Sequence, residues 1–127
     1  AVYAAGLTGL DIDGCETYGI ANQLADPVEA NSCSRVLRLA EDDDAPLLLR
    51  ASKTGIGNAM HAGSGVSLMQ AILTSIAGSI GPTMHLRQSN PYLDITELPL
   101  HFVSEVVPFR MASTFMTSFG RGFGGTN

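Results

Sequence analysis

Hydrophobic and polar positions along the chain follow two patterns, short apolar runs and helical spacings, which alternate with one another. Residues 46–52 form a continuous apolar run of strand length, and residues 10–17 form another short strand-like segment. An uninterrupted apolar run is typical of a strand that is buried on both faces, as in a parallel sheet. Further along, apolar residues alternate over 98–102, and residues 106–118 supply another predicted strand.

A first helix is predicted from Asp26 to about residue 39. Asp26 can cap it, Pro27 suits the first helical position, and Glu29 completes a capping box. A structural role as cap and reciprocal partner is therefore the preferred interpretation of both carboxylates. The predicted apolar face consists of Val28, Cys33, Val36 and Leu37.

A second helix is predicted from about Ala62 to Ala77, after the glycine-rich passage 53–65. Its larger apolar residues are spaced by three and four positions: Val66, Met69, Ile72, Leu73 and Ile76. Many of its other residues are alanine, glycine or serine, so the helix can pack closely between other layers. Residues 78–94 form a long irregular connection with two prolines, and residues 1–9 are predicted as the end of a helix.

The predicted order is strand, helix, strand, helix and then further strands, without an internal repeat. This order indicates a layered α/β architecture with helices packed on a mixed sheet.

Composition narrows the class of protein. The chain has 127 residues, of which 45% are hydrophobic and 15% charged, so it suits one folded domain or a piece of a larger one. Its net charge of -5 argues against nucleic acid as a partner. No apolar stretch is long enough for a membrane span, and no signal peptide is visible. From the sequence at its two ends, we expect truncation at both.

Few residues of the sequence, taken singly, indicate disulfide, metal-binding or cofactor chemistry. Cys15 and Cys33 are too few for a disulfide framework, although a single disulfide between them is an alternative. Both are interpreted as small core residues in a reducing compartment, either the cytoplasm or an organellar lumen. The acidic residues 41–45 lack the spacing of a calcium loop and are interpreted as a solvated turn. The histidines and cysteines lack zinc-ligand spacing, so neither a metal nor a cofactor is predicted.

Three segments in order resemble the β-ketoacyl synthases, or ketosynthases, of polyketide and fatty-acid synthases. ETYGIANQLADPVEA (16–30) is similar to the family's E-A-H-G-T-G-T-x-x-G-D-P-x-E-A passage. SKTGIGNAMHAGSG (52–65) is similar to V-K-S-N-I-G-H-x-x-x-A-A-G, and TSFGRGFGGTN (117–127) resembles the closing S-F-G-x-G-G-T-N turn. The connector GPTMHLRQSNPYLD (81–94) also fits the family. The residues within these motifs resemble those of polyketide synthases more than those of fatty-acid synthases.

The resemblance covers only the family's C-terminal portion, so it implies the C-terminal half of a thiolase-like fold. The family catalyses decarboxylative Claisen condensation of acyl thioesters. Its nucleophilic cysteine belongs to the N-terminal half, and its final strand follows the T-N turn. We therefore expect residues 1–127 to be a partial ketosynthase C-terminal domain.

The resemblance places the family's two catalytic histidines at Tyr18 and Asn58 of this chain. Tyrosine and asparagine can donate hydrogen bonds, but they do not exchange protons near neutral pH as histidine does. Lys53 matches the family's lysine, which pairs with an acidic residue and supports the site; a surface or helix-cap lysine is the alternative. Phe119 or Phe123, in the closing turn, would line the pocket.

His61 offers a shifted alternative to Asn58, whereas His85 and His101 are interpreted as structural or surface residues.

Three functions remain open from the sequence. The chain is part of a condensing enzyme that is inactive by itself, a noncatalytic ketosynthase-like partner protein, or a decayed fragment. The first implies an acyl carrier protein with acyl or malonyl phosphopantetheine thioesters as partner. The first two imply a homo- or hetero-oligomer with a ketosynthase-like chain.

Overall fold

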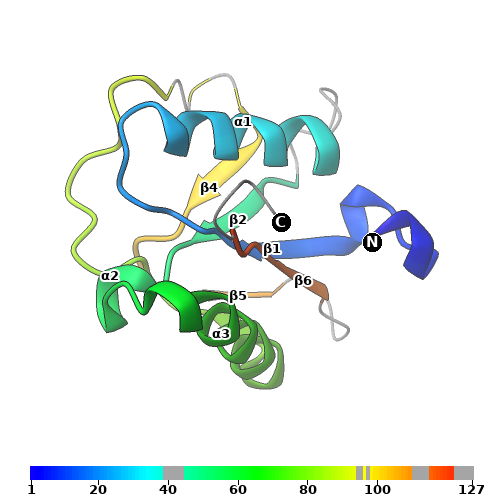
Figure 1. Cartoon of the computed structure of the whole chain (residues 1–127). Coiled ribbons are helices and arrows are strands. Elements are labelled where there is room, and N and C mark those ends of the chain that lie inside the picture. Colours follow the sequence, from blue (N-terminus) through cyan, green and yellow to red (C-terminus); the bar gives the residue numbers. More distant parts are fainter. Residues whose placement is uncertain (39–44, 94–95, 97, 110–114, 122–127) are drawn as a thin grey trace.

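A computed structural model of the chain describes residues 1–38, 45–93, 96, 98–109 and 115–121 (Figure 1). Its centre is a four-stranded sheet in which every pairing is parallel. From one edge to the other, the strands are β4 (Leu100–Phe102), β2 (Leu47–Arg50), β1 (Ile12–Glu16) and β6 (Phe115–Ser118). The strands predicted at 10–17, 46–52 and 98–102 are confirmed, as is the parallel sheet.

Shorter elements surround this sheet. Residues 106–118 supply β6 and the short strand β5 (Val107–Pro108), which pairs antiparallel with β3 (Ser79–Ile80). Parallel and antiparallel pairings are therefore both present. A helical turn, α2 (Lys53–Ile56), follows β2. The other short elements of the described residues are 3₁₀ turns: η1 (Tyr3–Ala5), η2 (Gly9–Asp11) and η3 (Met60–Ala62).

The helix α1 (Ala25–Leu37) covers one face of the sheet and buries the hydrophobic core against it (Figure 1). Its buried positions include Ala30, Cys33, Ser34 and Leu37, which share one stripe at helical spacing. The predicted apolar face is right for Cys33 and Leu37 but wrong for Val28 and Val36, which are 60% and 56% exposed. These two residues lie outside the stripe that faces the sheet.

A buried arginine joins the end of α1 to the segment that precedes β1. Arg38, 2% exposed, directly follows the helix in extended conformation. Its guanidinium donates hydrogen bonds of 2.6–2.8 Å to the backbone carbonyls of Gly9, Ile12, Leu37 and Ala45. The segment before β1 is thereby tied to the helix end. The prediction that residues 1–9 end a helix is wrong, because only a 3₁₀ turn forms there.

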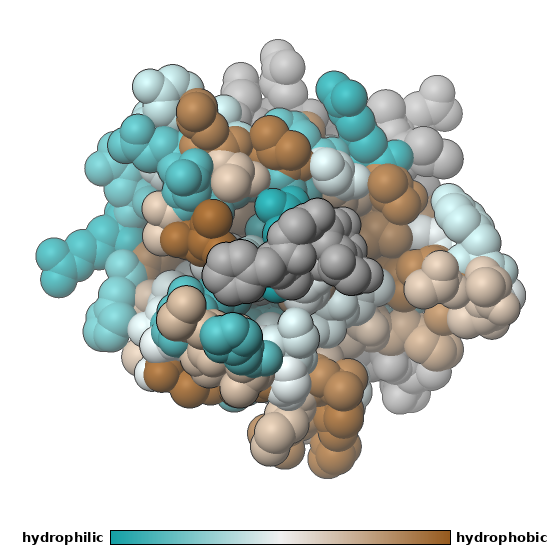
Figure 2. All heavy atoms as spheres, viewed as in Figure 1, coloured by the Kyte–Doolittle hydropathy of each residue, from teal (hydrophilic) through white to brown (hydrophobic). Residues whose placement is uncertain are grey.

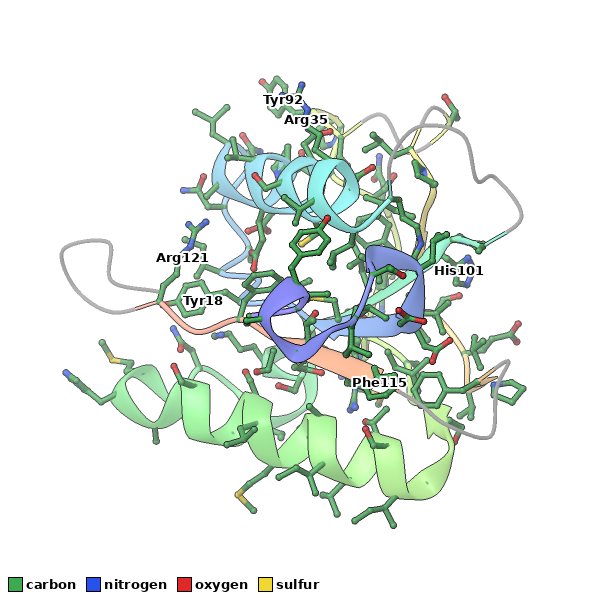
Figure 3. All side chains as sticks on the ribbon, turned by 90° about the vertical axis from the view of Figure 1, so that its right-hand side faces the viewer. Tyr18, Arg35, Tyr92, His101, Phe115 and Arg121 are labelled. Atoms are coloured by element: carbon green, nitrogen blue, oxygen red, sulfur yellow. The ribbon has the colours of Figure 1, made fainter. Side chains whose placement is uncertain are left out.

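The helix α3 (Gly63–Ala77) covers the opposite face of the sheet, and its existence confirms the second predicted helix (Figure 1). Its buried residues are small or polar: Gly63, Ser67, Ala71 and Thr74. Its large apolar residues are exposed: Leu68, Met69, Ile72, Leu73 and Ile76. Figure 3 shows α3 side chains projecting away from the sheet, and in Figure 2 hydrophobic side chains gather at the lower edge, where Figure 1 places α3.

No helix in the described part of the chain is long and apolar enough to cross a membrane. The acidic residues 41–44 lie outside the described residues, so the prediction of a solvated turn is untested there.

Candidate functional site

The candidate site lies where three neighbouring strands end. Tyr18 follows β1, Lys53 follows β2, and Phe119 follows β6. Because these strands are parallel, their carboxyl ends meet at one edge of the sheet, which is where open α/β sheets commonly bind ligands. In Figure 3, Tyr18 lies at this end of the sheet, between α1 and α3.

The loop from β1 to α1 is held by Glu29. Its Oε1 accepts a hydrogen bond from the Tyr18 amide at 2.7 Å, and its Oε2 accepts one from the Gly19 amide at 3.1 Å. Gly19 has a φ of 45°, a left-handed conformation that favours glycine. Glu29 is itself buried, so the carboxylate fixes this loop from inside the molecule.

The predicted capping box of Asp26 and Glu29 is wrong. The helix begins at Ala25, so Pro27 occupies the third helical position, and Glu29 turns to the β1–α1 loop instead. Asn22 satisfies the helix start: its Oδ1 accepts hydrogen bonds from the Leu24 and Ala25 amides at 2.9 and 3.0 Å. Asp26 lies in the first turn, and its buried Oδ1 has no hydrogen-bond partner among the described residues.

Lys53 and Tyr18 are brought into direct contact. The Lys53 Nζ donates a hydrogen bond of 2.5 Å to the Tyr18 carbonyl and lies 4.0 Å from the centroid of its ring. This is the geometry of a cation–π interaction. Burial lowers the pKa of Lys53, while the negative charges of Glu29 and Glu16 oppose that shift.

A fully buried carboxylate, Glu16, joins the three strand ends. Its Oε1 accepts a 2.6 Å hydrogen bond from the Ser52 amide, and its backbone carbonyl accepts one from the Phe119 amide at 3.0 Å. Its Oε2 is buried without a hydrogen-bond partner in the described part. Burial raises the pKa of Glu16; hydrogen bonds from Ser52 and the nearby Arg50 and Lys53 charges oppose this.

Sequence reasoning assigned Glu16 no role. The available signal was a carboxylate within a segment predicted as a strand, since a buried acid needs partners.

The other predicted site residues lie apart from this contact. Asn58 is exposed between α2 and η3, and its Oδ1 accepts a hydrogen bond from the Met60 amide at 3.1 Å. No described interaction joins Asn58 to Tyr18 or Lys53. Phe119 is half-exposed beside α1, and Phe123 lies outside the described residues.

Two clefts flank α1. The connector cleft, about 790 Å³, lies between the β1–α1 loop, the end of β2 and residues 83–93, and it is lined by Gly19, Asp26, Leu49, Leu93 and Phe102 among others. The β6 cleft, about 440 Å³, lies between the N-terminal turn, α1 and the end of β6, and it is lined by Cys33, Leu37, Thr117 and Phe119 among others. The predicted pocket residue Phe119 therefore borders the β6 cleft.

No described cluster of His, Cys, Asp or Glu residues could hold a metal ion. His61, His85 and His101 are exposed.

Residues 1–87 match the family described as β-ketoacyl synthase, C-terminal domain. A phenolphthiocerol/phthiocerol polyketide synthase of Mycobacterium tuberculosis is 30% identical over 127 residues, covering 97% of this chain and 7% of that protein. Probable polyketide synthase 26 of Dictyostelium discoideum is 33% identical over 115 residues, covering 87% of this chain and 4% of that protein.

Solved structures agree with these relatives. The oxazolomycin ketosynthase domain OzmH KS7 of Streptomyces albus is 26% identical with a TM-score of 0.88, covering 98% of this chain and 22% of that one. A bacillaene synthase module 1 ketosynthase from Bacillus amyloliquefaciens shares the fold, with a TM-score of 0.88 and 20% sequence identity. The match covers 98% of this chain and 24% of the ketosynthase chain. The predicted fold, the C-terminal half of a thiolase-like architecture, is confirmed.

This chain thus spans a small part of each relative, and its first 87 residues carry the family's pattern. It belongs to the β-ketoacyl synthase family and corresponds to the C-terminal domain of polyketide synthase ketosynthases.

Proposed function

We propose that this chain contributes the C-terminal part of a polyketide synthase ketosynthase, and that it is inactive by itself. The reaction would be decarboxylative Claisen condensation of acyl thioesters, with the nucleophilic cysteine supplied by another segment. Cys15 and Cys33 are only 0% and 3% exposed. Their burial supports a nucleophile from another segment, because a nucleophilic cysteine must reach its substrate.

The contact between Tyr18 and Lys53 is the observation that carries the assignment of the site. Lys53 binds the Tyr18 carbonyl and covers its ring, so it fixes this residue at the end of β1. The lysine charge at the same place would favour negative charge that develops on a substrate oxygen. Preorganised donors of this kind contribute about 100- to 1000-fold each to such reactions.

Asn58 would complete the site by donating a hydrogen bond from its amide. Its exposed position supports a contact with substrate rather than a role in the core.

The apolar side of α3 supports association with the rest of a ketosynthase. Five large apolar side chains are exposed along this one helix. Exposed apolar surface of this kind more often marks a protein–protein interface than a surface that stays in contact with solvent. The partner would be the remainder of the ketosynthase or a second ketosynthase-like chain. An acyl carrier protein with acyl or malonyl phosphopantetheine thioesters would deliver the substrates.

A noncatalytic partner protein is the second candidate, and the same contact favours it. By the sequence resemblance, Tyr18 would take the place of a family histidine, and its ring lies under Lys53. A tyrosine hydroxyl does not exchange protons near neutral pH as a histidine does.

The test combines the purified chain with a ketosynthase N-terminal segment that carries the nucleophilic cysteine. Light scattering measures the complex, and mass spectrometry detects condensation of acyl and malonyl groups held on carrier protein. We expect a complex in which the double variant Tyr18→His/Asn58→His condenses substrates faster than the natural sequence. Condensation by the isolated chain would refute the proposal, and a complex that stays inactive in both forms would assign the noncatalytic role.

A further inference from the structure

Glu16, the last residue of β1, carries a carboxylate that is completely buried. Its neighbour Cys15 belongs to the hydrophobic core that α1 covers. Because side chains alternate along a strand, Glu16 lies on the other face of the sheet, which α3 covers. Glu29 holds the Tyr18 amide from α1. The two carboxylates therefore approach the same strand end from opposite faces.

A short series of contacts leads from Glu16 to Lys53. The Glu16 Oε1 accepts a hydrogen bond of 2.6 Å from the Ser52 amide. The Ser52 carbonyl accepts hydrogen bonds from the amides of Gly55 and Ile56 at 3.0 and 3.1 Å, and these contacts begin the helical turn α2. Lys53 is the first residue of that turn. The position of Lys53 therefore depends on a backbone segment that Glu16 holds.

The pairing of β1 with β2 does not need the Glu16 side chain. Thr17 donates two hydrogen bonds to the Arg50 carbonyl, one from its amide at 2.8 Å and one from its hydroxyl at 3.0 Å. These bonds join the two strand ends directly. Removal of the Glu16 carboxylate should therefore disturb α2 more than the sheet.

The charge of Glu16 has a second effect on Lys53. Burial lowers the pKa of Lys53, and the negative charges of Glu29 and Glu16 oppose that shift. Arg50 and Lys53 are the positive groups that act on Glu16 in turn. A glutamine in place of Glu16 would keep an oxygen for the Ser52 amide but would lose the negative charge. The hydrogen bond and the charge can therefore be tested separately.

We propose that Glu16 is a positioning residue of the ketosynthase site, which acts through the Ser52 amide to hold the Lys53 ammonium against Tyr18. Glu16 is buried, so its effect reaches the site through Lys53, whose Nζ contacts the Tyr18 carbonyl and ring. This inference rests on the proposed function, which assigns Tyr18 and Lys53 to the site.

The test follows the side chain of Lys53 by NMR. Lys53 is the only lysine of the chain, so isotopically labelled lysine gives one set of side-chain signals. Its Nζ lies 4.0 Å from the centroid of the Tyr18 ring. The ring current should therefore shift the neighbouring ε-methylene protons upfield. Tyr18→Leu identifies this contribution, because it removes the ring.

Two variants of Glu16 separate its effects. Glu16→Ala should abolish the upfield shift, and the Ser52 amide, which loses its acceptor, should exchange its hydrogen about tenfold faster or more. Glu16→Gln should keep the upfield shift, because its side-chain oxygen can replace Oε1. The pKa of Lys53 should nevertheless fall below its value in the natural chain, since the negative charge is missing.

Leu37→Ala is the control for a general loss of stability. Leu37 is the last residue of α1 and belongs to the core, so its removal should destabilise the chain without moving the lysine signal. An upfield shift that survives in folded Glu16→Ala would overturn the proposal, and so would an equal loss of that shift in Leu37→Ala. Circular dichroism checks folding. If Glu16→Ala does not fold, an unchanged pKa of Lys53 in Glu16→Gln would overturn the proposal.

These measurements use the isolated chain and need no condensation. Their failure would remove the role of Glu16 and leave the complementation test of the proposed function unaffected. Conversely, an inactive complex would bear on the proposed function and not on what holds Lys53 in place.

Discussion

The two helices on opposite faces of the sheet have inverted patterns of burial. On the sheet side, α1 buries Cys33 and Leu37, and its outer side mixes valine with polar residues. By contrast, α3 places small and polar residues against the sheet and turns its leucines and isoleucines outward. The sheet is the same for both helices, so the difference lies in what each helix meets on its other side.

This difference supports the proposal that α3, more than α1, contributes to an interface with a further chain. Burying one leucine or isoleucine side chain contributes about 1.5–3 kcal/mol. A helix that leaves several exposed loses that contribution unless a partner covers them. The solved ketosynthases, of which this chain covers about a quarter or less, contain the additional chain that could do so.

The largest expected difference comes from matched leucines on the two helices. Leu37 on α1 is 5% exposed and Leu73 on α3 is 56% exposed. Leu37→Ala should lower the free energy of unfolding by about 3 kcal/mol, because it opens a cavity in the core. Leu73→Ala should change it by less than about 0.5 kcal/mol. Urea unfolding of the dilute chain measures both, and equal losses would break the comparison.

The next effect concerns the carboxylate by which α1 holds the site. Glu29→Ala leaves the Tyr18 and Gly19 amides without their acceptor, which should cost about 1–3 kcal/mol. Glu29→Gln keeps one carbonyl oxygen and should cost less. Hydrogen exchange of these two amides gives a local readout, since it should accelerate most in the alanine variant. Unchanged exchange would show that the loop is held by other contacts.

The pH dependence of stability distinguishes the buried acid Glu16. Its pKa is raised in the folded chain by burial, so the folded state binds the proton more tightly than the unfolded state. This contribution to stability is complete below the unfolded pKa of about 4.5 and is lost as pH rises through the raised value. The stability of the natural chain minus that of Glu16→Gln should therefore fall between acidic and neutral pH. A difference that rises with pH would have the wrong sign.

The smallest effect belongs to the contact between Lys53 and the Tyr18 ring. Tyr18→Leu removes the cation–π interaction and should cost about 0.5–1 kcal/mol at this partly exposed position. Tyr18→Phe keeps the aromatic ring and should cost less. Thermal unfolding compares the two variants, and an equal cost would mean that the ring itself contributes nothing.

The sequence predicted the order of the elements and the family, because apolar spacing and motif order are local properties. It did not predict which side of α3 faces outward, since periodicity defines a face without stating what covers it. The role of Glu29 was also missed, because its partners lie ten and eleven residues away in a loop without regular structure.

The most direct test of the α3 interface is the oligomeric state of charged variants. Light scattering would compare the natural chain with Met69→Glu and Leu73→Glu on α3, and with Val28→Glu and Val36→Glu on α1 as matched exposed controls. The account predicts that the natural chain and the α1 variants associate with themselves or with a ketosynthase N-terminal segment, and that the α3 variants do not. Loss of association in the α1 variants, with the α3 variants unaffected, would contradict it.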